Sequence, residues 1–287
     1  MTALLLTSPY LFSMLVGIVG LLVGSFLNVV IYRLPIMLQR SWRKDCLDYL
    51  QLEADVETEP FNLSLPLSRC PNCQSPIKPY QNIPVISYVF LKGQCAHCKN
   101  PISCRYPLIE ALTAITSVLV AWHFGYTPQV WFALLLTWGL IALSFIDIDH
   151  QLLPDNITLP MLWLGLLLSL FGLFTNPEAS IIGAIAGYLV LWLVYQGFKL
   201  ATGKEGMGYG DFKLLALFGA WLGWQTLPMI ILLSSLVGAV IGISLIIFAK
   251  HDHNKPIPFG PYLSAAGWIS LLWGNDINQL YLTSVGL

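Results

Sequence analysis

The sequence has few charged side chains. Only 10% of its 287 residues are Asp, Glu, Lys or Arg, whereas 56% are hydrophobic. Soluble domains usually carry about 25% charged residues, so this composition excludes an ordinary soluble domain and indicates a membrane protein. The formal net charge of −1 gives no support for a nucleic-acid partner, because nucleic-acid binding relies on basic surfaces.

Basic residues are also missing from the start of the chain. Residues 1–9 contain no Lys or Arg, and no small-residue cleavage site follows the first apolar run. A secretory signal peptide needs both features, so we expect the uncharged run at residues 1–32 to be kept and to contain the first membrane helix. Arg33 follows that run, which suits a helix whose N-terminus lies outside the cytoplasm.

Uncharged runs predict an all-α polytopic membrane protein. A spanning helix needs about 20 apolar residues, and the runs at 111–146 and 214–249 are too long for one helix each. Each run contains a turn signal, GYTP at 125–128 and WQTLP at 224–228, so each should form two helices. We expect about eight transmembrane helices, near residues 10–32, 107–124, 128–147, 156–174, 179–199, 211–223, 227–249 and 257–275.

Lys and Arg are absent from one side of this predicted topology. With eight alternating spans, none of the fourteen falls in the turns on that side. All of them fall within residues 33–106, 148–155, 199–213 and 250–256. The positive-inside rule makes the basic side cytoplasmic, so we expect both termini to be periplasmic.

The six cysteines include two Cys-x-x-Cys pairs. CPNCQSPI at 70–77 recurs as CAHCKNPI at 95–102, and two such knuckles are typical of a zinc ribbon. Four thiolates complete a tetrahedral site, so the predicted Zn²⁺ is structural and leaves no position for a catalytic water. Thiols stay reduced on the cytoplasmic side, which argues against disulfides. The expected ligands are Cys70, Cys73, Cys95 and Cys98, and Cys46 and Cys104 have no assigned role.

The spans and the ribbon predict three parts of the chain. Residues 1–34 hold the first transmembrane helix, and residues 35–105 form a cytoplasmic loop with the zinc ribbon. Residues 106–287 form a seven-helix membrane domain. The first part of the loop has helix-forming residues of mixed charge, so we expect an amphipathic helix ahead of the ribbon.

Two aspartates stand at the ends of apolar runs. Asp147 closes one run in LSFIDIDHQ, and Asp211 follows three alternating glycines in EGMGYGDF. Ionisable residues at membrane helices favour a functional role, and the alternatives are an interfacial acid for Asp147 and a helix N-cap for Asp211. The N-cap does not account for the glycines, which lack Cβ and let an extended peptide approach. These glycines are Gly206, Gly208 and Gly210.

Two carboxylates that meet at one site have a known chemistry. Close carboxylates share a proton, so the ionised one can activate water while the protonated one polarises a peptide carbonyl. This is the chemistry of an aspartic protease, and we expect both aspartates at cytoplasmic helix ends.

Other polar residues near these ends are open to several interpretations. Asp149 should be solvated, and Asp155 should cap the fourth helix. Glu110, in RYPLIEAL, lines the site, orients a backbone group or pairs with Arg105. Packing explains PFGPY at 258–262 about as well as function does.

These motifs together resemble the type IV prepilin peptidases, bifunctional leader peptidase/N-methyltransferases of bacterial inner membranes. The resemblance covers nearly the whole chain, and Gly208-Tyr209-Gly210-Asp211 matches the Gly-x-Gly-Asp element of intramembrane aspartic proteases. It rests on GSFLNVVIYRLP, the Cys-x-x-Cys pairs, RYPLIE, IDIDHQLLPD, GKEGMGYGDFKLLA and PIPFGPYL.

The resemblance implies a catalytic pair, substrates and cofactors. Asp147 and Asp211 cleave the leader of type IV prepilins and of type II secretion pseudopilins, with Gly208, Gly210 and Glu110 as supporting residues. Cleavage takes place on the cytoplasmic face of a Gram-negative inner membrane. S-adenosylmethionine then supplies a methyl group to the new N-terminus, and the loop with Gly93 is a candidate for its site. The oligomeric state, the pilins cleaved and the aspartate protonated at rest stay open.

Two other classes of protein compete with the peptidase. A proton-coupled membrane transporter also uses intramembrane carboxylates, but here the acids gather at one side of the membrane rather than at its midplane. A zinc-ribbon adaptor without catalysis explains the cysteines and leaves the Gly-x-Gly-Asp element without a role.

Overall fold

A computed structural model describes residues 8–52, 60–249 and 257–285 of the chain. In these ranges the regular secondary structure is helical apart from two isolated β-bridges, which confirms the expected all-α class. The expected basic loop at 250–256 lies outside the described residues. The chain forms two compact units, Met1–Tyr126 and Thr127–Leu287. The three-part division at residues 34 and 105 stays a prediction.

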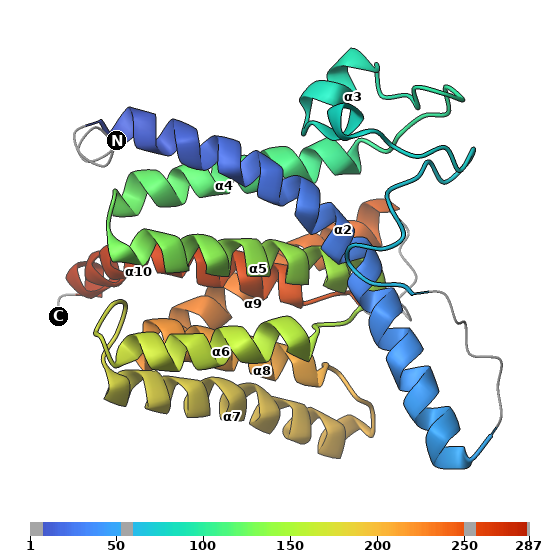
Figure 1. Cartoon of the computed structure of the whole chain (residues 1–287). Coiled ribbons are helices and arrows are strands. Elements are labelled where there is room, and N and C mark those ends of the chain that lie inside the picture. The colour runs from blue at the N-terminus through green and yellow to red at the C-terminus, as the bar shows by residue number, and fades with distance from the viewer. Residues whose placement is uncertain (1–7, 53–59, 250–256, 286–287) are drawn as a thin grey trace. The chain divides into compact units, whose positions relative to one another are not determined.

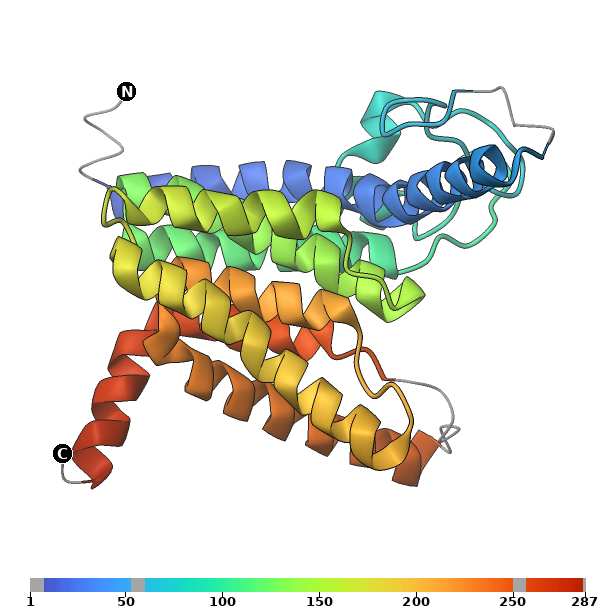
Figure 2. The same ribbon diagram turned by 90° about the horizontal axis from the view of Figure 1, so that it is seen from below.

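Two long helices form the frame of the first unit. α2 (Pro9–Leu50) and α4 (Arg105–Phe124) lie side by side (Figure 1, Figure 2). A Cβ at Gly20 would lie 2.8 Å from Ser117 Oγ, and one at Gly24 would lie 2.7 Å from the Cα of Glu110. The Gly-xxx-Gly spacing therefore lets the two backbones approach closely, as in membrane helix pairs.

α2 continues well past the span predicted at 10–32. The hydroxyl of Ser8 accepts a hydrogen bond from the Leu11 amide at 3.4 Å at its start, and the helix ends at Gln51 with a left-handed φ of 52°. Pro35 lies inside the helix, and neither glycine nor a second proline follows before its end. The helix expected ahead of the ribbon is present, therefore, as a continuation of the first helix.

The rest of the first unit connects α2 to α4. It contains η1 (Pro79–Asn82), α3 (Ile86–Phe90) and the four ribbon cysteines. Arg33, buried on α2, donates from Nη1 to the Asn62 carbonyl at 2.9 Å and from Nη2 to the Pro66 carbonyl at 2.6 Å. A buried guanidinium needs such acceptors, so Arg33 fastens the start of this segment to the helix.

Within the described residues, the second unit contains six helices, among them the short and largely buried α8 (Tyr209–Leu222). They are α5 (Pro128–His150), α6 (Asp155–Ser169), α7 (Pro177–Thr202), α8, α9 (Leu227–Ala249) and α10 (Gly260–Val285), with η2 (Trp224–Thr226) between α8 and α9. From Asp211 to Trp221 every residue of α8 except Lys213 is buried. A Cβ on Gly183 of α7 or on Gly219 of α8 would collide with the other backbone, so these two helices pack in direct backbone contact.

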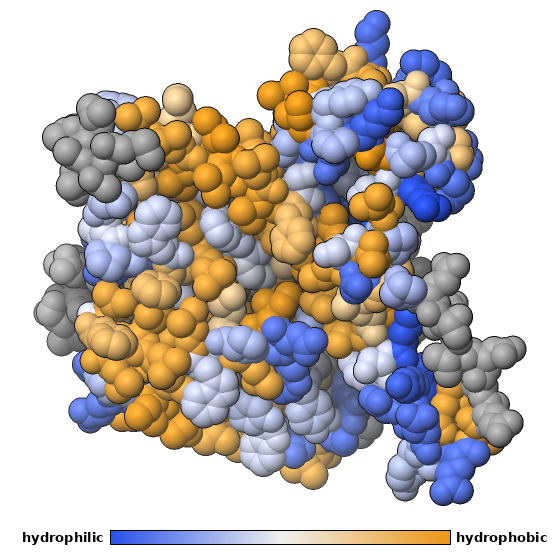
Figure 3. All heavy atoms as spheres, in the orientation of Figure 1, coloured by the Kyte–Doolittle hydropathy of each residue, from blue (hydrophilic) through white to orange (hydrophobic). Residues whose placement is uncertain are grey.

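The chain is a multi-pass membrane protein. Five helices in the described residues are long and apolar enough to span a bilayer. They are Pro9–Leu50, Arg105–Phe124, Pro128–His150, Pro177–Thr202 and Trp224–Ser244. The eight expected spans each coincide with a helix, but α6 and α8 have only 15 and 14 residues, so the number eight stays a prediction. In the first unit, Figure 3 shows hydrophilic residues gathered around α3 and the C-terminal end of α2.

Candidate functional site

Asp147 lies in the last turn of α5 and is only 6% exposed. Its Oδ2 accepts a hydrogen bond from the Gly260 amide at 3.0 Å, which fixes the carboxylate against the start of α10. A Cβ at Gly260 would lie 2.7 Å from the same oxygen, so this approach requires glycine. The PFGPY segment thus supplies a partner for Asp147, which its sequence did not distinguish from packing.

Asp211 lies in the first turn of α8 and is 7% exposed. The N-cap of this helix is Gly208, and Asp211 is the third helical residue, so the N-cap alternative for Asp211 is wrong. Within the residues that the structure describes, its Oδ1 is buried without a hydrogen-bond partner. Burial of such an atom without a partner is costly, so a shared proton, a water molecule or a substrate group that bonded to it would stabilise the site.

The two aspartates lie at one place in the second unit. Asp147 is close enough to Asp211 to act on it electrostatically. The buried side chain of Leu153 connects their surroundings, because a Cβ at Gly210 would lie 2.7 Å from Leu153 Cβ and one at Gly260 would lie 3.1 Å from Leu153 Cδ2. The ends of α5, α8 and α10 therefore meet around two buried carboxylates and one apolar side chain.

The nearby acids differ from the central pair. Asp149 is exposed, as expected for a solvated residue. Asp155 is the first residue of α6, whose N-cap is Pro154, so the expectation that Asp155 caps the helix is wrong. Its carboxylate instead accepts hydrogen bonds from Lys213 Nζ at 2.7 and 2.8 Å. Sequence reasoning missed this ion pair, for which the Lys two residues after Asp211 was the available signal.

Glu110 has a defined partner within the first unit. Its Oε2 accepts a hydrogen bond from the Val85 amide at 2.7 Å, and the residue is 8% exposed. Val85 has a φ of 58°, a strained conformation for a β-branched residue. Orienting a backbone group, one of the roles considered for Glu110, is thus the geometry observed, while its supporting role in catalysis stays a prediction.

The four ribbon cysteines converge on one point. All their Sγ atoms lie within 4.8 Å of one another. The Cys70–Cys98 and Cys73–Cys95 sulfur distances are 3.8 and 4.0 Å. Tetrahedral Zn–S bonds of about 2.3 Å place sulfurs about 3.8 Å apart, so the cluster has the dimensions of a zinc site.

The sequence repeat is also a structural repeat. In the first knuckle the Gln74 amide donates to the Cys70 carbonyl, and in the second the Lys99 amide donates to the Cys95 carbonyl. Gln74 and Lys99 both have a positive φ, of 57° and 59°. Side-chain and backbone hydrogen bonds with Ser75 lower the pKa of the Cys73 thiol to about 6, so this sulfur is a thiolate, the form that binds metal, at neutral pH.

Local packing explains why glycine occupies position 93, in the loop that the sequence makes a candidate for the methyl-donor site. The φ of Gly93 is 67°, and a Cβ there would lie 2.9 Å from the hydroxyl oxygen of Tyr88. Tyr88 in turn donates to the Ile102 carbonyl at 3.3 Å. Glycine at this position thus allows the turn before the second knuckle to pack on Tyr88.

Comparison with known proteins identifies the family. Residues 18–124 match the bacterial peptidase A24 N-terminal domain, and residues 134–243 match the type IV leader peptidase family. Relatives named prepilin leader peptidase/N-methyltransferase are similar over nearly the whole chain. The protein from Stutzerimonas stutzeri is 56% identical over 97% of this chain and 96% of its own, and that from Pseudomonas aeruginosa is 54% identical over 98% and 97%. The chain belongs to the type IV leader peptidase family.

A more distant member of the leader peptidase family covers the chain equally well. The prepilin leader peptidase/N-methyltransferase of Legionella pneumophila is 45% identical over 98% of both chains. No solved structure matches the chain. The expected family is confirmed, and nothing in these comparisons supports the transporter alternative. Both aspartates fall in the part matched by the leader peptidase family, and all four ribbon cysteines fall in the part matched by the N-terminal domain.

Proposed function

We propose that this protein is a membrane aspartic endopeptidase that removes the leader from type IV prepilins and then N-methylates the new N-terminal residue. Asp147 and Asp211 form the catalytic pair. The observation that carries this proposal is the meeting of two buried carboxylates at the ends of α5 and α8. The names of the relatives support both activities.

The geometry suits peptide hydrolysis by a shared proton. The ionised carboxylate takes a proton from a water molecule, whose oxygen attacks the carbonyl carbon of the scissile bond. The protonated carboxyl donates to the carbonyl oxygen, and proton transfer to the leaving nitrogen accompanies cleavage of the C–N bond. The Gly260 amide holds Asp147 Oδ2, and Asp211 Oδ1, which has no hydrogen-bond partner among the described residues, would gain one from water or substrate in the reacting complex.

Gly208 and Gly210 support this site in different ways. Gly210 lets the first turn of α8 pack on Leu153, whereas among the described residues a Cβ at Gly208 would meet nothing nearer than Asp211 Oδ2 at 3.8 Å. Space beside Gly208 therefore remains for the backbone of an extended substrate. A substrate backbone in this space would lie next to the Asp211 carboxylate, and catalysis needs the reacting groups to be held this close together.

The site faces the cytoplasm in the inner membrane of a Gram-negative bacterium. The one-sided distribution of Lys and Arg supports this orientation. Both aspartates then lie near the cytoplasmic interface, where a membrane-anchored prepilin or type II secretion pseudopilin presents its leader. The exposed apolar side chains of the spanning helices contact membrane lipid.

Two cofactors complete the proposal. Cys70, Cys73, Cys95 and Cys98 would hold one Zn²⁺, which stabilises the fold of the loop because four protein ligands leave no open coordination position. S-adenosylmethionine supplies a methyl group on a sulfonium, and the acceptor is the amine that cleavage exposes. Methylation of a natural substrate therefore follows cleavage.

Purified full-length protein in detergent tests both activities. A purified type IV prepilin is incubated with the enzyme, with and without S-adenosylmethionine, and its mass is measured. We expect loss of the leader in both reactions and a further gain of one methyl group only with the donor. An uncleaved prepilin in both reactions would contradict the proposal, as would methylation without cleavage.

A further inference from the structure

The segment that leads into Asp211 is fastened to the end of α7. Residues 203–208 connect α7 to α8, and the chain leaves α7 at Gly203, whose amide donates to the Lys199 carbonyl at 2.8 Å. The Lys204 amide donates to Thr202 Oγ1 at 3.3 Å. A Cβ at Gly206 would lie 2.8 Å from the ring of Phe198, so the segment also packs on this helix.

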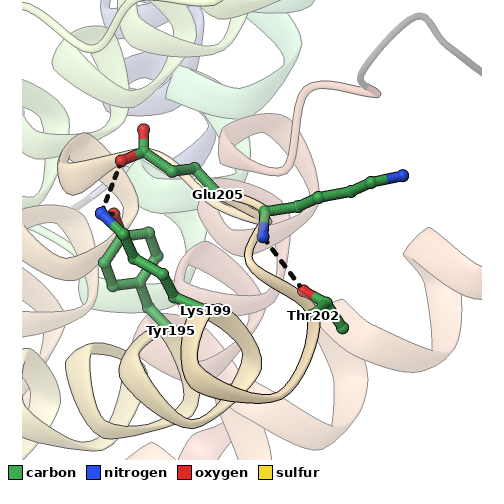
Figure 4. A network of polar contacts seen from close by, with 5 residues as sticks. Tyr195, Lys199, Thr202 and Glu205 are labelled. Atoms are coloured by element: carbon green, nitrogen blue, oxygen red, sulfur yellow. Dashed lines mark hydrogen bonds and ion pairs between the residues drawn. The ribbon is translucent and has the colours of Figure 1, made fainter.

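One ion pair holds the middle of this segment. Lys199 Nζ lies 2.8 Å from Glu205 Oε1 and donates to the hydroxyl of Tyr195 at 3.3 Å (Figure 4). The hydrogen bond from Lys199 holds the pKa of Glu205 below its usual range, so Glu205 is ionised at neutral pH. Figure 4 shows Glu205 reaching back from the segment to the two α7 side chains.

Tyr195 links this ion pair to the helix that carries Asp211. It is 2% exposed, and its ring centroid lies 5.5 Å from that of Tyr209 and 5.6 Å from that of Phe212. The Tyr209 and Phe212 rings are themselves 5.4 Å apart. Because these two residues stand on either side of Asp211 in the sequence, the contacts run from Glu205 to the first turn of α8.

We infer that Lys199 and Glu205 are positioning residues for leader cleavage, which hold the segment before α8 so that the Asp211 carboxylate faces Asp147. Neither residue has to touch the substrate for this role. The inference rests on the proposed peptidase function. The inference gives a role to Lys199 and Glu205, two polar residues that lie outside the Gly-x-Gly-Asp element.

If the ion pair served only to stabilise the fold, activity would fall together with the amount of folded protein. The positioning role predicts a different result. The side chains of Lys199 and Glu205 are 44% and 67% exposed, and exposed ion pairs contribute little to overall stability. Loss of the pair should therefore leave the protein folded and loosen only the local segment. Small displacements of a catalytic group lower the turnover rate more than substrate binding, so the effect should fall on kcat rather than on KM.

Steady-state cleavage of a purified prepilin by the full-length enzyme in detergent tests this inference. In Glu205→Gln and Lys199→Gln we expect kcat to fall by about 1.4-fold to fivefold, the factor that the interaction free energy of one exposed pair corresponds to, with KM and the thermal unfolding midpoint unchanged. The charge-swapped double variant, Lys199→Glu with Glu205→Lys, should recover most of the lost kcat. Lys204→Gln is the matched control, because it removes an exposed charge from the same segment and keeps its backbone hydrogen bond; its kcat should equal that of the unmodified enzyme.

Three results would overturn the inference. One is an unchanged kcat in both single variants while the unmodified enzyme cleaves. Another is a fall in kcat that accompanies an equal loss of folded protein. The third is a rise in KM without a change in kcat, which would mean that the pair contacts the substrate. If the unmodified enzyme does not cleave the prepilin, the proposed function itself is wrong.

Discussion

Replacing Gly260 by alanine should displace the Asp147 carboxylate without unfolding the protein. The added Cβ would lie 2.7 Å from Asp147 Oδ2 and 3.1 Å from Leu153 Cδ2. Both atoms are at the ends of side chains that can move, whereas the Gly260 amide that donates to Asp147 stays in place. The substitution therefore changes the position of a catalytic group and leaves its chemistry intact.

The size of the effect follows from the required movement. Ordinary van der Waals contact with a Cβ begins near 3.4 Å, so Oδ2 must move by about 0.7 Å if it alone gives way. A misplacement of about 1 Å in a catalytic site costs on the order of 100-fold in rate. We therefore expect kcat for leader cleavage to fall by about tenfold to 100-fold, with little change in the amount of folded protein.

The matched control lies on the same helix. A Cβ at Gly274 would lie 3.8 Å from Ser270 Cβ and 3.9 Å from Thr226 Cγ2, which is ordinary contact, so Gly274→Ala should cleave as fast as the unmodified enzyme. Initial rates on a purified prepilin and thermal unfolding of each variant provide the measurement. Equal kcat in Gly260→Ala and Gly274→Ala would refute the idea that Gly260 sets the position of Asp147.

Four further predictions concern the pair, the metal, the topology and the second activity. Asp147→Asn and Asp211→Asn should each abolish cleavage, because an amide neither accepts the proton of water nor donates an acid proton, whereas Asp149→Asn should still cleave. Cleavage by Asp147→Asn together with loss of cleavage in Asp149→Asn would exclude Asp147 as a catalytic residue. Replacing any one ribbon cysteine by serine should lower bound zinc, and elemental analysis that finds no zinc in the unmodified protein would contradict this. In intact cells an impermeant thiol reagent should label cysteine at Thr127 and not at Lys204; the opposite pattern would invert the topology. Asp211→Asn should still methylate a pilin already trimmed of its leader, as read by mass spectrometry, because the nucleophile is then a free amine; a folded, zinc-loaded variant without this activity would mean that one site performs both reactions.

Helix positions were predictable because apolar length and turn residues are local signals. GYTP and WQTLP separate α4 from α5 and α8 from α9 at the expected places. The extension of α2 to Leu50 was harder to predict from the sequence, because hydropathy marks where a helix leaves the membrane and not where it ends. The burial of α8 is a tertiary effect that depends on backbone contact between Gly183 and Gly219.

The candidate site was predictable in its residues and not in its contacts. Asp147 and Asp211 stand out because acids are rare in apolar sequence. Gly260 did not stand out as a partner, because its hydrogen bond to Asp147 joins residues 113 positions apart and spacing carries no information at that range. Asp155 was misassigned for the same reason, since its partner, Lys213, lies 58 positions away.

The three glycines before Asp211 illustrate how packing divides one sequence signal into separate roles. The sequence suggests a single purpose, room for a peptide substrate. In the structure, Gly206 makes room for Phe198 and Gly210 makes room for Leu153, whereas at Gly208 the nearest side-chain atom of the described residues to a Cβ would be Asp211 Oδ2, at 3.8 Å. Two glycines thus bring parts of the enzyme together, and the space for a substrate beside Asp211 comes from the one between them.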